Sequence, residues 1–247
     1  MFLLKRKRQI GIASYTSPGG REKNEDSIIV LEKPNEDCIA IVADGLGGQG
    51  EGQVASSEAL KVIVKCFEQS DVYSPEKVAN WYNIANKVVL DNQKECCHMM
   101  TTMVSLVISS NMALCAHVGD SRLYHFENGK LQFQSFDHSV SQMAVLSGEI
   151  SKEQIRGHAD RNRLLRALGR DEDVLVEISE PIDISKGEHA FILCSDGFWE
   201  FVYEEEMERL LKKSKTAEEW LLKMREKHKQ RVKPNHDNNS AIAILIK

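Results

Sequence analysis

The sequence predicts an α+β fold in which antiparallel sheets are flanked by helices. The apolar segments follow one another as strands, two helices, a block of strands, short helices, more strands, two helices and a last strand. This order lacks the regular alternation of strand and helix that builds a doubly wound parallel sheet. The dipeptide Asn128-Gly129, typical of a two-residue hairpin turn, separates two apolar runs and favours antiparallel pairing.

Ten short segments predict strands, because they are continuously apolar or alternate between apolar and polar residues. They cover residues 10–15, 27–31, 38–43, 103–109, 113–118, 123–126, 131–133, 174–178, 190–194 and 241–246.

Two longer segments carry the period of an amphipathic helix. Residues 52–69 place apolar side chains on one face, and residues 75–94 begin with a proline, which suits a first helical turn. We expect further helices at residues 139–146, 151–157, 204–212 and 216–229.

The composition indicates a single folded domain over residues 1–247. With 42% hydrophobic residues the chain can bury a substantial core, and it contains no internal repeat, low-complexity run or Pro/Ser-rich linker. The polar residues 137–169 are expected to form an inserted lobe.

Charge and hydropathy argue against nucleic acid and membrane as partners. The net charge is -5, from 37 acidic and 32 basic residues spread along the chain, so no positive field attracts nucleic acid. The basic cluster at residues 5–8 is interpreted as a solvated lead-in to the first strand. No apolar run approaches the roughly 20 residues that span a membrane. We expect a soluble, cytoplasmic protein.

The six cysteines fit a reducing compartment. Cys38, Cys115 and Cys194 lie in apolar runs, where cysteine behaves as a small hydrophobic residue. Cys96 and Cys97 are adjacent and no C-x-x-C pattern occurs, so a zinc site is not indicated.

A glycine-rich stretch, GLGGQG at residues 45–50, follows an apolar run and satisfies the G-x-G-x-x-G pattern of dinucleotide-binding proteins. Asp44 before it and Glu51 after it would place two carboxylates where a pyrophosphate must lie. A nucleotide-dependent oxidoreductase is therefore the weakest of the functions that we consider.

Carboxylates recur at the edges of the apolar runs. They are Glu25 and Asp26 before residues 27–31, Asp44 after 38–43, Asp120 after 113–118, Asp196 after 190–194 and Asp237 before 241–246. Each alone is compatible with turn chemistry. Several carboxylates at one end of a sheet repel one another, however, and need a cation to neutralise them. Oxygen ligands without His or Cys indicate Mg²⁺ or Mn²⁺. The glycines after Asp44 would let a backbone carbonyl, most simply that of Gly45, face the metal.

Eight short motifs occur in a definite order along the chain. They are GGREKNED (19–26), VADGLGG (42–48), TTMVSL (101–106), VGDSRLY (118–124), DHS (137–139), NRLLRALG (162–169), CSDGFWE (194–200) and DNNSAIAI (237–244). Together they resemble the motif series of the metal-dependent Ser/Thr protein phosphatases of the PP2C (PPM) family, in its bacterial form. The resemblance runs from about residue 10 to residue 246.

The resemblance implies an α-β-β-α sandwich with two Mn²⁺ or Mg²⁺ ions at one edge of its central sheets. Asp44 would bridge the two ions. Glu25 and the carbonyl of Gly45 would complete one site, and Asp196 and Asp237 would complete the other.

Further roles are implied around this centre. Asp26 would act through metal-bound water, and Asp120 would hold a third, weaker ion. Residues 137–169 would form a mobile flap beside the site. Arg21 would bind the substrate phosphate, since a guanidinium fork can pair with two phosphate oxygens at once.

The implied activity is hydrolysis of phosphoserine and phosphothreonine in proteins by direct attack of a water that bridges the two ions. No P-loop, C-x5-R loop or Ser-His-Asp pattern supplies another nucleophile. The implied partners are phosphorylated proteins, including a cognate Ser/Thr kinase and its targets, and we expect a monomer.

The chain departs from the family pattern at four positions. Leu46 and Gln49 stand where relatives have histidine, Gln53 replaces the usual acid, and Met100 replaces the glycine before Thr-Thr. None of them removes a direct metal ligand, but they leave no protein general acid assigned. The alternative function is a catalytically impaired pseudophosphatase that serves as a docking or regulatory module.

Overall fold

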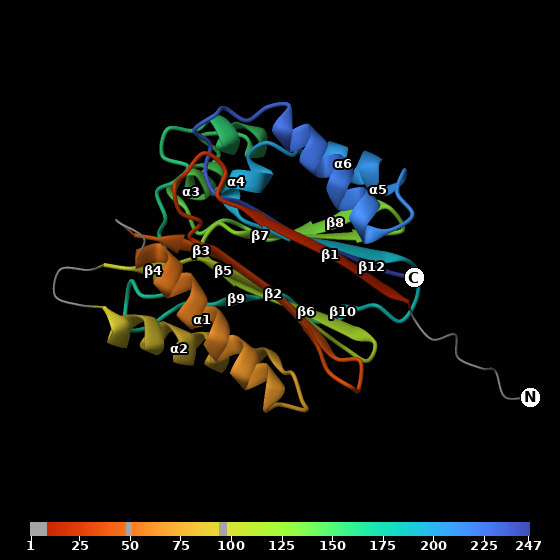
Figure 1. Ribbon diagram of the computed structural model, residues 1–247, viewed down its shortest axis with the longest axis horizontal. Helices are drawn as coiled ribbons and strands as arrows, with labels where there is room; N and C mark the ends of the chain where they lie inside the picture. The colour runs from red at the N-terminus through yellow and green to blue at the C-terminus, as the bar shows by residue number, and fades with distance from the viewer. Residues whose placement is uncertain (1–8, 48–50, 94–97) are drawn as a thin grey trace, which may run out of the picture.

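The computed structural model describes residues 9–47, 51–93 and 98–247 as four stacked layers: helices, sheet, sheet and helices (Figure 1). The strands are β1 Ile10–Ser17, β2 Asp26–Glu32, β3 Cys38–Leu46, β4 Met100–Thr101, β5 Met103–Ser109, β6 Met112–Val118, β7 Arg122–Glu127, β8 Lys130–Gln134, β9 Glu177–Ile178, β10 Ile182–Asp183, β11 His189–Cys194 and β12 Asn239–Ile246. The helices are α1 Glu51–Glu68, α2 Pro75–Asn92, α3 Val140–Leu146, the 3-10 helix η1 Lys152–Gly157, α4 Asp196–Trp199, α5 Glu204–Leu211 and α6 Ala217–Lys229.

Both sheets are antiparallel, as the order of elements predicts. One has the strand order β1-β12-β11-β7-β8, and the other has the order β10-β6-β5-β3-β2, with β4 beside β3 and β9 beside β6. Every strand pairing among the described residues is antiparallel. A dinucleotide-binding fold needs parallel strands joined through a helix, so the oxidoreductase alternative is wrong.

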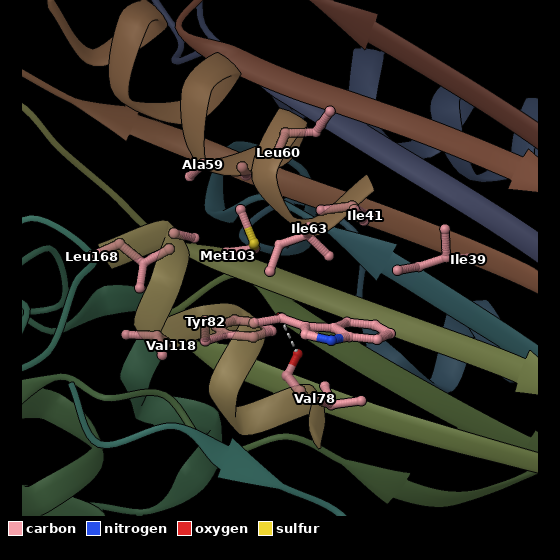
Figure 2. Close-up of a cluster of buried hydrophobic side chains, with 14 of the residues drawn as sticks. Ile39, Ile41, Ala59, Leu60, Ile63, Val78, Tyr82, Met103, Val118 and Leu168 are labelled. Carbon is pink, nitrogen blue, oxygen red and sulfur yellow. Dashed lines mark hydrogen bonds between the residues drawn. The ribbon is translucent and has the colours of Figure 1, made fainter. Parts of the chain in front are cut away.

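Three apolar cores hold the four layers together, and β3 takes part in two of them. Its Ile39 and Ile41 side chains meet α1 and α2 in the cluster that Figure 2 shows. Cys38, Ala40 and Val42 face the other sheet in the central core. This alternation follows from the two-residue period of a strand, and burial on both faces explains why β3 is almost wholly apolar.

The third core lies between the sheet β1-β12-β11-β7-β8 and helices α4 to α6, which appear in blue in Figure 1. In β12, Ala241 and Ala243 face this helical layer, while Ile242 and Ile244 face the central core. Trp220 of α6 is fully buried there, and its indole N–H donates to the Met207 carbonyl at 2.9 Å.

The elements differ from the predicted ones mainly where they are short. The sequence misses β4, β10 and α4, which span only two to four residues, because so few residues carry no readable period. The strand predicted at residues 174–178 is reduced to β9, and the helix predicted at 151–157 is a 3-10 helix. The Asn128-Gly129 hairpin is confirmed between β7 and β8, with φ of 49° and 73° at its two residues.

Several other expectations meet the structure here. Cys38, Cys66, Cys115 and Cys194 are free thiols, whereas Cys96, Cys97, the basic cluster 5–8 and residues 48–50 lie outside the described residues. In the described part of the chain, no helix combines the length and the apolarity that crossing a membrane requires. Single-domain organisation and the limits of the flap stay predictions.

We expect Tyr82→Phe to lower the free energy of unfolding by about 1–3 kcal/mol. The Tyr82 hydroxyl donates to the Ala116 carbonyl and shares a hydrogen bond with Ser105 Oγ, each at 2.8 Å, inside the core beside α2. Urea unfolding of Tyr82→Phe, Ser105→Ala and the double variant measures the loss. Strictly additive effects would contradict the pairing of the two hydroxyls.

Candidate functional site

Five strand ends meet at one edge of the sandwich, and each brings a carboxylate. Asp26 opens β2 and pairs in register with Asp44 near the end of β3. Asp120 follows β6, Asp196 follows β11 and opens α4, and Asp237 stands just before β12. Antiparallel pairing places the start of one strand beside the end of its neighbour, so acids from distant parts of the sequence come together.

A pocket of about 730 Å³ opens at this edge. Seven of the eight residues that the sequence singles out line it, namely Arg21, Glu25, Asp44, Gly45, Asp120, Asp196 and Asp237. Among the described residues of the lining there is no histidine and no cysteine. The donor set therefore consists of oxygens, which suits a hard divalent cation such as Mg²⁺ or Mn²⁺.

Asp26 lies behind the pocket and is only 6% exposed. One carboxylate oxygen, Oδ2, accepts hydrogen bonds from Ser195 Oγ at 2.8 Å and Ser240 Oγ at 2.6 Å. The other oxygen, Oδ1, is buried without any partner in the structure. A buried acceptor left in this state is costly, so the residues present fit a bound cation or its water at this place.

Burial and mutual repulsion raise the pKa values of these carboxyl groups. Burial, followed by repulsion from Asp196 and Asp237, raises the pKa of Asp26 to about 7 despite its two serine donors. Burial and then Asp237 raise that of Asp196 to about 6. The pKa of Asp44 is raised well above its usual range by burial and by Asp26, Asp196 and Asp120. A cation at the centre would offset the repulsion among the carboxylates and lower their pKa values again.

The glycine-rich turn brings two backbones into contact beside Asp44. A side chain at Gly45 would collide with the Gly52 carbonyl and the Glu25 carbonyl, and a side chain at Gly52 would collide with the Gly45 backbone. Gly45 N–H donates to the Glu25 carbonyl at 3.2 Å, and Ser56 Oγ donates to that same carbonyl at 2.6 Å. The glycines thus permit close packing of β3 against the start of α1 and leave the Gly45 residue at the pocket wall.

Asn238 ties the two sheets together at the site, and sequence reasoning missed it. Its side-chain oxygen accepts from the Glu25 N–H at 2.8 Å, and its amide donates to the Pro18 and Lys23 carbonyls at 2.9 Å. Its position next to Asp237 in the DNNS motif is the only signal that the sequence offers, because an asparagine near a turn has many structural uses.

Arg21 lies in the pocket as expected, but its guanidinium group is engaged. Nε and one terminal nitrogen donate to the two carboxylate oxygens of Asp237 at 3.1 and 3.0 Å. Both side chains are about half exposed, at 57% and 45%. A substrate phosphate would therefore have to compete with Asp237 for the same guanidinium fork.

A buried ion pair supports Asp120 from behind, and sequence reasoning missed this too. The Arg122 guanidinium donates to both oxygens of Asp137 at 2.7 and 2.6 Å and stacks on the Trp199 ring at 3.5 Å. The Trp199 indole N–H donates to the Asp120 carbonyl at 2.9 Å. Asp137 is the first residue of the expected flap, so the same cluster fixes the flap's root and Asp120.

A second group of possible metal ligands, His117, His138 and Glu177, is better explained as a hydrogen-bonded network. His138 Nδ1 accepts from the Gly119 N–H at 3.1 Å, so the ring proton lies on Nε2 and faces Glu177 at 3.2 Å. Arg166 also approaches this nitrogen, at 3.4 Å. A protonated nitrogen beside a guanidinium group is unsuited to bind a metal.

Of the four residues that depart from the family pattern, three lie among the described residues. Leu46 lines the pocket, Gln53 is exposed on α1 and Met100 begins β4. Gln49 lies outside the described residues.

Comparison with known proteins agrees with this geometry. Residues 20–233 match the family described as protein phosphatase 2C. The chain is 34% identical over 208 residues to the serine/threonine phosphatase stp of Listeria monocytogenes, covering 81% of each protein. Its fold is similar to that of a bacterial serine phosphatase, with a TM-score of 0.84, 26% identity, and 97% and 98% of the two chains covered. It is also similar in fold to the catalytic domain of the protein phosphatase PstP in complex with two manganese ions, with a TM-score of 0.81, 22% identity, and 97% and 99% of the two chains covered.

Without metal, the carboxylate cluster should make stability fall as pH rises. Asp26 has a folded-state pKa of about 7 against ~4 in an unfolded chain, so the folded state holds more protons between these values. We expect Asp26→Asn to gain stability relative to the wild type as pH rises from about 4 to about 7, with no further change above that range. Urea unfolding in chelator measures this difference. Asp91→Asn, an exposed change in α2, is the control, and a pH-independent difference for Asp26→Asn would contradict the assignment.

Proposed function

The chain belongs to the protein phosphatase 2C family, and from this premise we propose that it hydrolyses phosphoserine and phosphothreonine esters of proteins in the carboxylate-lined pocket. The observation that carries the proposal is the convergence of Asp44, Asp120, Asp196 and Asp237 in one pocket, with Asp26 buried behind them. Such a cluster is costly unless cations neutralise it, and metal-assisted hydrolysis is the chemistry that such cations supply.

We propose that Mn²⁺ or Mg²⁺ ions are held by Glu25, the Gly45 carbonyl, Asp44, Asp196 and Asp237. The two manganese ions in the PstP catalytic domain, which shares the fold, support this choice of cofactor. When bound, two such ions would neutralise the phosphoryl group and make water nucleophilic near neutral pH. The third, weaker site expected at Asp120 is also part of this proposal.

The protein's own groups orient the reactants around this centre. The partnerless Oδ1 of Asp26 is available to accept a hydrogen bond from water, while Ser195 and Ser240 hold the other oxygen of the same carboxylate in place. Arg21 would bind the phosphate through its guanidinium fork after leaving Asp237. Water then attacks the phosphorus directly, and the phosphoryl group is not transferred to a side chain of the protein.

Protonation of the leaving oxygen is assigned to solvent water. Leu46 is apolar, and the described residues of the pocket lining include no histidine that could act as a general acid.

The proposed partners are phosphorylated proteins, among them a cognate Ser/Thr kinase and its targets. A cytoplasmic location fits the four described cysteines, which are unpaired as in a reducing compartment. The alternative of a docking module without turnover has no support, because the candidate ligands are retained and the curated relatives are named as phosphatases.

Hydrolysis of a phosphothreonine peptide tests the activity directly. We expect turnover with Mn²⁺ or Mg²⁺, none in chelator, and a loss of at least about a thousandfold in kcat/KM for Asp196→Asn, which removes a ligand charge from the centre. The matched control is Asp91→Asn on the exposed face of α2, which should behave as the wild type. Full metal-dependent activity of Asp196→Asn would overturn the assigned site.

Arg21→Lys tests how the phosphate is bound. Lysine keeps the charge but cannot form two parallel hydrogen bonds, so we expect kcat/KM to fall about ten- to a hundredfold. Arg209→Lys, an exposed change in α5, serves as the control and should leave kcat/KM unchanged. An Arg21→Lys variant with wild-type kcat/KM would remove this residue from substrate binding.

A further inference from the structure

A second, smaller cavity lies on the other side of the Gly19–Arg21 loop and is distinct from the carboxylate pocket. It has a volume of about 170 Å³ and is lined by β1, α6 and the chain that leads into β12. This is several times the ~30 Å³ that one water molecule occupies in the liquid, so a small polyatomic ligand can enter.

The charged side chains that line this cavity are both cationic. Arg225 and Lys229 lie one helical turn apart on α6, and His228 and His236 also line the cavity. Among the described residues of the lining there is no aspartate or glutamate. The chain as a whole has a net charge of -5, but the charge of this cavity is positive, opposite in sign to that of the carboxylate pocket. We therefore expect it to attract anions.

The cations of this basic cavity have not been neutralised elsewhere. In the described part of the chain Arg225 has no carboxylate partner and lies over the Tyr15 ring, with its guanidinium carbon 4.1 Å from the ring centre. Lys229 has no ion-pair partner among the described residues and is exposed. This contact with the ring restricts the guanidinium group, which lowers the entropy cost of binding an oxyanion.

The two histidines are fixed by their other contacts. His228 Nε2 is 2.8 Å from the Gly197 carbonyl, and His236 Nδ1 is 2.7 Å from the Lys233 carbonyl. Each nitrogen must donate to its carbonyl, so both rings are held in place as walls of the cavity beside Arg225 and Lys229.

The basic cavity and the carboxylate pocket have different linings, and hydrogen bonds connect residues of the two. Tyr15 Oη donates to Asn239 Oδ1 at 3.0 Å, and the Asn239 amide donates to the Asp237 carbonyl at 3.1 Å. Gly19, at φ 62°, packs so closely on the Asp237 carbonyl that no side chain would fit. Asn239 and Gly19, which line the basic cavity, are therefore in direct contact with Asp237 of the carboxylate pocket.

We propose that this basic cavity, formed around Tyr15, Arg225, His228, Lys229 and His236, is a second binding site for a phosphoryl group, separate from the site of hydrolysis. A planar guanidinium fork and an ammonium group, one helical turn apart, match a tetrahedral oxyanion with several acceptors. The group could be free inorganic phosphate or a second phosphorylated residue of the substrate protein. Binding of free phosphate does not depend on the proposed activity, whereas binding of a second phosphorylated residue of the substrate rests on it.

Calorimetric titration of the full chain with inorganic phosphate, in Mg²⁺ buffer at fixed ionic strength, tests the site. We expect two binding events in the wild type. Lys229→Gln and the double variant Arg225→Gln/Lys229→Gln should weaken one of them about tenfold or more, and Arg21→Ala should weaken only the other. The side-chain NMR signals of His228 and His236 should shift with phosphate in the wild type and in Arg21→Ala, but not in the double variant.

Lys227→Gln is the matched control. Lys227 lies in the same last turn of α6, where a positive charge interacts favourably with the helix dipole, but it does not line the cavity. Equal weakening by Lys227→Gln would assign the effect to general charge, and a single binding event in the wild type would leave no second site. Either result overturns the proposal. A normal melting temperature for Lys229→Gln excludes misfolding as the cause.

Kinetics separates the two sources of the phosphoryl group. If the source is the substrate, a doubly phosphorylated peptide has a lower KM than its singly phosphorylated form, and the double variant loses this advantage. If the source is free phosphate, the two peptides have the same KM and only the calorimetric event changes. Since binding is measured without turnover, an inactive chain would contradict the proposed function and still report on this cavity.

Discussion

Repulsion among buried carboxylates is the constraint on which the arrangement at the sheet edge depends. Burial, and after it repulsion from neighbouring carboxylates, raises the pKa values of Asp26, Asp44, Asp120 and Asp196. A fold tolerates such a cluster only when rigid elements hold it and a cation is available to offset it. The β-sandwich supplies the rigidity through apolar cores on both faces of each sheet, so that the strand ends cannot move apart to relieve the repulsion.

Hydrogen bonds from polar side chains hold the elements around the carboxylates together. Asn238 joins the β2 side to the β12 side, and Ser195 and Ser240, beside β11 and in β12, bind Asp26 at the start of β2 in the other sheet. The Arg122–Asp137 pair and Trp199 support Asp120 from the flap and from α4. The links through Asn238, Ser195 and Ser240 cross between elements far apart in the sequence, so the centre exists only when both sheets are docked.

Opposite charge balances lie on the two sides of the Gly19–Arg21 loop. The carboxylate pocket suits cations, and the cavity around Arg225 and Lys229 suits anions. Arg21 belongs to the first of these, where its pairing with Asp237 partly offsets the excess of acid. The Asp237 carboxylate accepts a hydrogen bond from Arg21, and the Asp237 carbonyl accepts one from the Asn239 amide. Asp237 therefore connects the two charged regions.

The sequence by itself determined the antiparallel α+β class, the long strands and helices, and the carboxylates at the strand ends, because periodicity and turn chemistry are local properties. The ordered motifs also indicated the family and its metal chemistry before any coordinates were considered. The tertiary structure alone decided that Arg21 pairs with Asp237, that Asp26 keeps one oxygen without a partner, and that Arg122 is buried against Asp137 and Trp199. It also decided the cationic cavity beneath α6, whose residues come from segments some 200 positions apart. These features could not be predicted because they depend on which strand ends the two docked sheets bring together. No local sequence pattern encodes the distance between two such strand ends.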